Sequence, residues 1–387
     1  MVSAVRKGLA VRAVARLFRV DHSVVRKWLK RAGRRRLDRV DFGSQSRAPK
    51  TLQRTAAEME DLILEVRRWL QEESPLGEYG PVAIRRELLA RPVERPPAIT
   101  TIKRILRRRG ALDGRRRIRR PAPPPGWYLP AVAAAQAEID SCDVIEDLKL
   151  EAGPLVDVFN VVSIIGKRVR SWPAEAPMSS DFATCALLRH WREHGLPDYV
   201  QFDNDTRFTG GSRWPNTLGT LIRTCLALNV TPVFAPPREH GIQNAIESAN
   251  GRWQAKIWRR FQHPSFAALK RCAATYENAA NRKNAASIGN APTRRRFPKR
   301  RTLLLPARPQ GTVILIRRTD AHSRVVILGK TYSLPVSWPY RLARCELDLT
   351  ASRLRFVGLR RQAFDQQPCL HSMPFLLPQK QPLSIKL

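Results

Sequence analysis

Three acidic residues lie at positions from which a fold could bring their carboxylates together. Asp140 is in the strand-like segment 137–144, and Asp203 is in a second one, 199–204. Glu247 lies in 244–258, whose apolar side chains recur at offsets of three and four and predict an amphipathic helix. A lone glutamate on a helix is usually a solvated side chain. Three carboxylates together, however, suit the two metal ions of a phosphodiester-transfer site.

The residue types also indicate which metal such a site would take. Mg²⁺ is a hard cation that prefers carboxylate, water and phosphate oxygens, and Mn²⁺ accepts the same ligands. We predict that Asp140 bridges two Mg²⁺ ions, that Asp203 and Glu247 each complete one, and that Mn²⁺ substitutes. Because three clustered acids repel one another, we expect the site to be empty or disordered without divalent metal.

Asp143 is an alternative first ligand, three residues after Asp140. Side chains alternate between the faces of a strand, so positions 140 and 143 lie on opposite faces and only one can enter the site. We place Asp140 in the site and keep Asp143 as the alternative.

The region around these acids has an alternating pattern of strands and helices. Residues 134–283 therefore predict a mixed α/β sheet with helices covering its faces. The predicted strands are 137–144, 155–165, 168–174, 199–204 and 233–235, and the predicted helices are 181–194, 218–228, 244–258 and 266–281.

The N-terminal residues 1–33 predict a helix-turn-helix. Val14, Leu17 and Phe18 form one apolar helical face, and Asp21 is placed to cap the next helix. A small helical bundle with a basic exterior is the alternative. In the helix-turn-helix interpretation the second helix presents four polar residues to a major groove, namely His22, Ser23, Arg26 and Lys27.

A second helix-turn-helix, with a wing as an option, is predicted for residues 51–112. Its last helix buries one apolar face and turns a basic face outward, with Thr100 as a candidate cap. Basic segments flank it, a linker at 34–50 and a Pro-rich linker at 113–133. The outward residues proposed to contact DNA are Lys103, Arg104, Arg107 and Arg108, joined by Lys256 and Arg259 at the end of the Glu247 helix.

The C-terminal third changes character again. Residues 284–308 form a basic, Pro-containing linker, and 309–360 read as a small β-barrel of short strands. The expected strands are 312–316, 323–328, 330–334, 344–348 and 353–356. Residues 361–387 predict a disordered tail.

Composition restricts the class of partner. The chain of 387 residues carries a formal net charge of +36, so we expect a polyanion, with double-stranded DNA the leading candidate. No apolar run approaches the roughly 18 residues of a membrane-spanning helix. The six cysteines stand singly, which disfavours a structural zinc site and fits a reducing cytoplasm.

The chain resembles a DDE-type insertion-sequence transposase with a retroviral-integrase-like, RNase H-like catalytic core. Asp140 stands where the family has its first acid, and the run from Phe202 to Phe208 is similar to the family's D-N-G-x-x-F motif. The run from Pro236 to Glu247 is similar to the loop and helix that present the family's glutamate. The likeness spans roughly residues 8 to 360 because the flanking modules also fit the family's layout.

This resemblance implies metal-dependent cleavage of DNA at the element's ends, followed by strand transfer into target DNA. It also implies a homo-oligomer assembled on DNA, in the cytoplasm of a bacterium and associated with the nucleoid. The sequence departs from the family at Asp205, where a glycine is expected. It also has a longer stretch between Asp203 and Glu247, with the surplus placed at 209–216.

Two other functions are consistent with the residues. One is a DNA-binding regulator with a catalytically decayed RNase H-like core, which Asp205 and the longer stretch favour. The other is a structure-selective nuclease of the same fold. Two DNA-reading modules argue against the nuclease, because such an enzyme needs no sequence readout.

Overall fold

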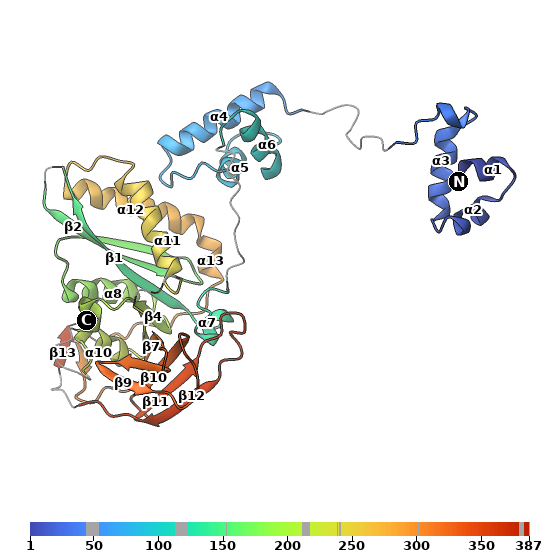
Figure 1. Cartoon of the computed structure of the whole chain (residues 1–387). Coiled ribbons are helices and arrows are strands. Elements are labelled where there is room, and N and C mark those ends of the chain that lie inside the picture. Colours follow the sequence, from blue (N-terminus) through green and yellow to red (C-terminus); the bar gives the residue numbers. More distant parts are fainter. Residues whose placement is uncertain are drawn as a thin grey trace. The chain divides into compact units, whose positions relative to one another are not determined.

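The computed structural model describes residues 1–43, 54–112, 123–151, 153–210, 217–237, 239, 241–300, 302–378 and 383–386 (Figure 1). The chain divides into two compact units, Met1–Glu60 and Asp61–Leu387. No helix in these described ranges is both long and apolar enough to cross a membrane.

The first unit contains the predicted pair of helices and one helix before them. Asp21 caps the second of the pair as predicted, because its Oδ1 accepts a hydrogen bond of 2.8 Å from the Ser23 backbone N–H. The turn before it includes Arg19, whose φ of 51° is left-handed. The elements are α1 (Val2–Arg6), α2 (Val11–Leu17), α3 (His22–Ala32) and the 3₁₀ turn η1 (Leu37–Arg39).

The predicted apolar face of the first helix is only partly correct. Val14 is buried, but the side chains of Leu17 and Phe18 are 69% and 48% exposed. The core of this bundle is instead built from Val14, Ala15 and Val25. On α3 the four predicted DNA-contacting residues are all exposed, which leaves them free to meet a groove.

A second group of three helices follows, α4 (Ala57–Glu72), α5 (Pro81–Ala90) and α6 (Ile99–Arg108). The predicted last helix is present as α6, but Thr100 does not cap it. That helix begins at Ile99, and its N-cap residue Ala98 has no side chain able to bond. Ile102, Ile105 and Leu106 are buried, whereas the four basic residues predicted to point outward are exposed.

The predicted alternation of strands and helices in the central region is confirmed. The first five strands lie side by side in the order β3-β2-β1-β4-β5, with β1, β4 and β5 mutually parallel and β2 and β3 antiparallel to their neighbours. This mixed sheet with flanking helices fits an RNase H-like α/β domain. The elements are β1 (Ile139–Lys149), β2 (Leu155–Ser163), β3 (Val169–Glu175), α8 (Ser180–His194), β4 (Tyr199–Phe202), α9 (Thr206–Thr209), α10 (Thr220–Ala227), β5 (Thr231–Phe234), α11 (Asn244–Trp253), the π-helical turn η2 (Gln254–Trp258) and α12 (Phe266–Lys283).

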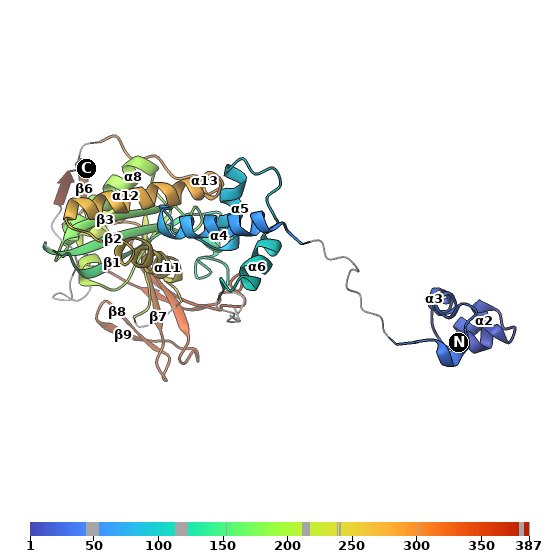
Figure 2. The ribbon, with the colours of Figure 1, turned by 90° about the horizontal axis from the view of Figure 1, so that it is seen from above.

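The two faces of this sheet are covered by different helices. On one face α11, η2 and α12 bury Trp253, Ile257 and Leu269 against β1 and β2. On the other face α8 and α10 pack on β1, β4 and β5 through Trp191 and Ile222. Figures 1 and 2 show α12 running along the part of the sheet that contains β3. Each face of β1 therefore meets its own helix.

The C-terminal strands are confirmed, but they do not close into the predicted barrel. Four of them continue the central sheet beyond β5 in the order β7-β10-β11-β12, and β7 is parallel to β5. No strand pairing among the described residues closes this open sheet. The strands are β6 (Thr302–Leu305), β7 (Thr312–Arg318), β8 (Arg324–Ile327), β9 (Lys330–Ser333), β10 (Leu342–Asp348), β11 (Arg353–Gly358), β12 (Cys369–Pro374) and β13 (Leu383–Lys386).

Three segments expected to be linkers or a disordered tail contain ordered structure. The tail expected beyond residue 361 contains β12, which extends the sheet, and β13, which pairs with β6. The end of the linker 113–133 holds a buried apolar cluster around Trp127 and Tyr128 and the short helix α7 (Pro130–Ala133). The segment 284–308 likewise contains α13 (Ala285–Gly289) and joins the core at Arg295, which bridges Leu196. Apolar burial on the core, rather than local periodicity, orders these segments.

Candidate active site

The acid that β1 presents to α11 is Asp143. Its Oδ2 accepts a hydrogen bond of 2.8 Å from Asn250 Nδ2, and Asn250 Oδ1 in turn accepts one of 2.9 Å from Asn160 Nδ2. Asn160 and Asn250 are buried, so these amides fix the Asp143 carboxylate on the face that α11 covers. Asp143 therefore lies on the face of the sheet that is covered by α11, the helix that carries Glu247.

Asp143, Asp203 and Glu247 share one electrostatic neighbourhood. The pKa of Asp143 is raised to about 6, mainly by burial and also by the negative charges of Asp203, Glu247 and Glu146, against one lowering hydrogen bond from the Val144 backbone. Burial also raises the pKa of Asp203. Asp203 directly follows β4, and Glu247 is exposed in the first turn of α11. Negative charge therefore accumulates where the two parallel strands and the helix meet.

The structure contradicts the choice of Asp140 as the first metal ligand. Asp140 is fully buried on the face of β1 that α8 covers, and its two oxygens are already bonded. Arg294 donates to Oδ1 at 2.5 Å and to Oδ2 at 2.9 Å, while Ser163 and Trp191 donate to the same two oxygens. Although burial alone raises an acid's pKa, the Arg294 guanidinium holds the pKa of Asp140 below its usual value. Asp140 is thus the anion of an internal ion pair.

The predicted opposition of positions 140 and 143 is confirmed by these contacts. Asp140 meets Trp191 of α8, whereas Asp143 meets Asn250 of α11. Asp143, kept above as the alternative, is the residue that lies with the other two acids.

Asp205, the departure from the family motif, is held in a local ion pair. Its backbone N–H donates to Asp203 Oδ1 at 3.0 Å, and its own Oδ1 accepts from the Arg207 backbone at 2.7 Å. Arg207 also forms ion pairs with the carboxylates of Asp205 and Glu146. The additional carboxylate is therefore neutralised by Arg207, and it shapes the turn that carries Asp203.

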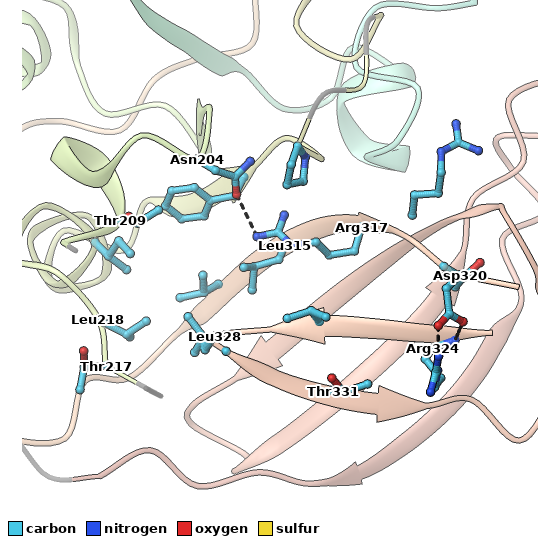
Figure 3. A pocket seen from close by; sticks show the side chains of 18 of the residues that line it. Asn204, Thr209, Thr217, Leu218, Leu315, Arg317, Asp320, Arg324, Leu328 and Thr331 are labelled. Carbon is cyan, nitrogen blue, oxygen red and sulfur yellow. Dashed lines mark hydrogen bonds and ion pairs between the residues drawn. The ribbon is translucent and has the colours of Figure 1, made fainter. Parts of the chain in front are cut away.

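Asn204 ties the Asp203 loop to the first C-terminal strand of the extended sheet. Its Nδ2 donates to the Ala235 carbonyl at 2.6 Å, and its Oδ1 accepts from Arg317 at 2.9 Å (Figure 3). These residues border a cavity of about 970 Å³ between the sheet, α10 and the β8–β9 hairpin. Arg317 of β7 thereby braces the loop at the ends of β4 and β5.

The basic residues that follow Glu247 divide into two groups. Lys256 donates to the Gly77 carbonyl at 2.7 Å, and Arg260 donates to the carbonyls of Ser74 and Glu72. Burial lowers the pKa of Lys256. These two side chains bind the loop between α4 and α5, which contradicts the prediction that Lys256 contacts DNA. Arg259 is exposed and retains that predicted role.

The described residues contain no group of three or more His, Cys, Asp or Glu side chains close enough to form a ready metal cage. The donor chemistry nevertheless fits hard divalent cations, because Asp143, Asp203 and Glu247 supply carboxylate oxygens only. Burial is the main cause of the raised pKa of Asp143, and the neighbouring negative charges that add to it would be relieved by a bound cation.

Three solved structures similar to this chain are all retroviral integrase structures. One is the magnesium-bound catalytic core of HTLV-2 integrase in its dimeric form, with 15% identity, 35% of this chain and 83% of that chain covered, and a TM-score of 0.27. The simian T-cell lymphotropic virus intasome in complex with PP2A regulatory subunit B56 gamma has 14% identity, coverage of 78% and 94%, and a TM-score of 0.32. The catalytic core of BIV integrase has 15% identity, coverage of 35% and 81%, and a TM-score of 0.26.

No protein-family model matches the chain, and no curated protein matches it. TM-scores this low support no inference about activity. Assigning a function therefore depends on the arrangement of the acids themselves.

Sequence reasoning missed the residues that hold the acids in place. Asn250 had a detectable signal, because it lies three residues after Glu247 on the predicted helix and so on a neighbouring part of its surface. The sequence contained no such signal for Asn160, Arg317 or Arg294. They come from distant segments that only the folded sheet brings to Asp143, Asn204 and Asp140.

Proposed function

We propose that this protein is a DDE-type transposase that cuts DNA at the ends of an element and joins it to target DNA. Asp143, Asp203 and Glu247 are the catalytic acids, with Asp143 in place of Asp140. The observation that supports this most is geometric: Asp143 is bonded to Asn250 of α11, the helix of Glu247, and lies on β1 beside the parallel strand β4 that Asp203 follows. A structural salt-bridge network would instead pair each acid with a cation, as Arg294 pairs with Asp140.

The three carboxylates would hold two Mg²⁺ ions, or Mn²⁺ in their place. Such ions, when bound, activate an attacking oxygen and neutralise charge on a phosphoryl group. The chain's own contribution is to orient the acids. Asn250 holds Asp143 Oδ2, the Asp205 backbone holds Asp203 Oδ1, and α11 presents Glu247 from its first turn. Asp143 Oδ1 also accepts a hydrogen bond of 2.9 Å from the Val144 backbone N–H, so a metal ion would bind this carboxylate through the remaining lone pairs of its oxygens.

The DNA partners would be contacted by the exposed basic residues of the helical units. We assign element-end binding to α3 through His22, Ser23, Arg26 and Lys27, and to α6 through its outward basic face of Lys103, Arg104, Arg107 and Arg108. Arg259 would add a phosphate contact near the acids. By the same resemblance the protein would act as a homo-oligomer on DNA, in a bacterial cytoplasm and at the nucleoid.

The alternative is a DNA-binding regulator with a decayed catalytic core. Asp205, at the position where the family has a glycine, and the longer stretch between Asp203 and Glu247 favour it. The two functions differ in chemistry and not in DNA binding, so cleavage must be measured together with affinity.

The test is nicking and strand transfer of duplex DNA carrying the sequences that flank the gene, with Mg²⁺ present. We expect the parent chain to cleave and join this DNA. We expect Asp203→Ala to lose both reactions while binding the same duplex with unchanged affinity. A parent chain that binds but never cleaves, with Mg²⁺ or Mn²⁺, would establish the regulator instead.

A further inference from the structure

A basic groove lies where the segment after α13 crosses the end of α8. Its volume is about 640 Å³, and Gly195, Phe297 and Pro298 form part of its wall. Six cationic side chains line it, namely Arg192, Arg294, Arg295, Arg296, Lys299 and Arg300. The sequence predicted this segment as a linker, so the groove has no role in the function proposed above.

The segment is fastened to the core by its first two arginines. Arg294 is bonded to the buried Asp140, and the Arg295 side chain donates to the backbone carbonyls of Pro197, Leu228 and Asn229. The Arg295 backbone also forms a bridge with Leu196. The groove is therefore a fixed surface of the domain, which distinguishes it from a solvated run of charges.

The remaining four cations are available to a ligand. Arg192, Arg296, Lys299 and Arg300 are exposed, and among the described residues the structure gives none of them a carboxylate partner. Arg192 lies over the Phe297 ring, 5.3 Å from its centroid, which holds its guanidinium at the groove. Four uncompensated positive charges in one groove require a polyanion rather than a single small anion.

The groove is separated from the catalytic acids. Gly195 and Leu196 precede β4 and Asp203 follows it, so this four-residue strand, about 13 Å long at roughly 3.3 Å per residue, lies between them. Arg294 also reaches Asp140 on the face that α8 covers, while Asp143 lies on the face that α11 covers. A ligand in the groove is thus not the phosphate at the acids.

We propose that this groove binds the phosphate backbone of duplex DNA, at a contact distinct from the catalytic acids and the helical units. Because the chain has a formal net charge of +36, nucleic acid is the polyanion that we expect it to bind. The repeated phosphates of a duplex match several neighbouring cations, and releasing the DNA's counterions makes such contacts favourable. An acidic protein segment is the competing occupant.

Chemical footprinting of Lys299 on the full chain tests the site directly. An amine-acetylating reagent is applied with and without a random-sequence duplex, and modification of Lys299 is compared by mass spectrometry with that of Lys270 on α12. We expect the duplex to suppress acetylation of Lys299, and polyglutamate at equal total charge to leave it modified. Unchanged reactivity of Lys299 with DNA, or equal protection by polyglutamate, would overturn the proposal.

A charge-neutralised variant gives an independent measurement. Arg296→Gln, Lys299→Gln and Arg300→Gln are combined, and the matched control combines Lys270→Gln, Arg271→Gln and Arg282→Gln, which are exposed on α12. The slope of log affinity against log salt should fall by about 2 to 3 in the groove variant, because each lost phosphate contact removes about 0.9. Equal slopes in the groove variant and the control would contradict the proposal.

This inference stands apart from the proposed catalysis. In the Asp203→Ala variant, duplex DNA should protect Lys299 from acetylation as well as it does in the parent chain, even though the variant would not cleave DNA. A chain that never cleaves DNA but protects Lys299 would refute the transposase and retain the groove, and the reverse result would refute only the groove.

Discussion

Two aspartates three residues apart on one strand have opposite electrostatic environments. Asp140 faces a guanidinium and two further donors, so it is a stable buried anion. Asp143 is buried near the charges of three other carboxylates, Asp203, Glu247 and Glu146, and accepts only from amide donors, and its pKa is raised to about 6. The charges nearest to each aspartate thus distinguish Asp140, a structural acid, from Asp143, a candidate catalytic acid.

Removing the charge of Asp143 should stabilise the folded protein at neutral pH. Because its pKa is about 6 in the folded state and ordinarily 3.8, the folded state binds more protons than the unfolded one between these values. Stability therefore falls as pH rises through this window and stays lower above it. Asp143→Asn should raise Tm at pH 7.5, with a smaller gain at pH 4.5, in scanning calorimetry without metal. The exposed Glu151→Gln serves as control, and an Asp143→Asn chain no more stable than the parent at pH 7.5 would refute this pKa.

Removing the cation partner of Asp140 should destabilise the domain strongly. Arg294→Gln leaves a buried carboxylate unpaired, which typically costs about 3–5 kcal/mol. The double variant Asp140→Asn with Arg294→Gln should recover much of that loss in chemical denaturation, because no charge then remains buried. The exposed Arg296→Gln is the matched control. A loss for Arg294→Gln no greater than for Arg296→Gln would show that the pair is not structural.

At the scale of elements, the three acids are assembled by two parallel strands and one helix. β1 and β4 are adjacent and parallel, so Asp143 and the end of β4 share one region, and α11 crosses β1 and β2 above it. The C-terminal strand β7 then supports the Asp203 loop through Arg317. The extended sheet is therefore part of the site's support.

Replacing Arg317 should loosen that loop without unfolding the sheet. Arg317→Met keeps the apolar part of the side chain but loses the bonds to Asn204 and Ala235. Hydrogen–deuterium exchange should accelerate over residues 203–209 and stay unchanged in β1. Arg353→Met, at an exposed position on β11, provides the comparison. Identical exchange of 203–209 in both variants would refute the bracing role.

The elements could be predicted from sequence where the pattern is local. Helical periodicity and short β-branched runs predicted β1 to β5, α8 and α11 within a few residues. The choice between Asp140 and Asp143 could not be made, because β1 is covered on both faces and its residues up to Cys142 are all buried. The deciding partner, Arg294, lies 154 residues away in the chain.

At the scale of the whole molecule, predictions failed where long-range packing decides the outcome. The strands beyond residue 312 were correctly expected, but their union with the central sheet depends on only two residue pairs, Val233 with Ile314 and Phe234 with Leu315. A pairing so short leaves no pattern in the sequence. The strands expected as a tail, β12 and β13, are likewise ordered by partners that precede them.

The basic surfaces of the two units should contribute separately to DNA affinity. Arg26→Gln with Lys27→Gln removes two exposed charges from α3. The salt slope of duplex binding should fall by about 2, from the loss of two phosphate-proximal cations. Arg271→Gln with Arg282→Gln on α12 is the control of equal charge. Equal slopes would exclude α3 from the DNA contact.

The most direct test of the central claim is Mn²⁺ binding by the full chain, measured by isothermal titration calorimetry at pH 7.5. We predict that the parent chain binds Mn²⁺, that affinity falls markedly in Asp143→Asn, Asp203→Asn and Glu247→Gln, and that Glu151→Gln binds as the parent does. Undiminished Mn²⁺ binding by Asp143→Asn would contradict the assignment of Asp143, Asp203 and Glu247 to one metal site.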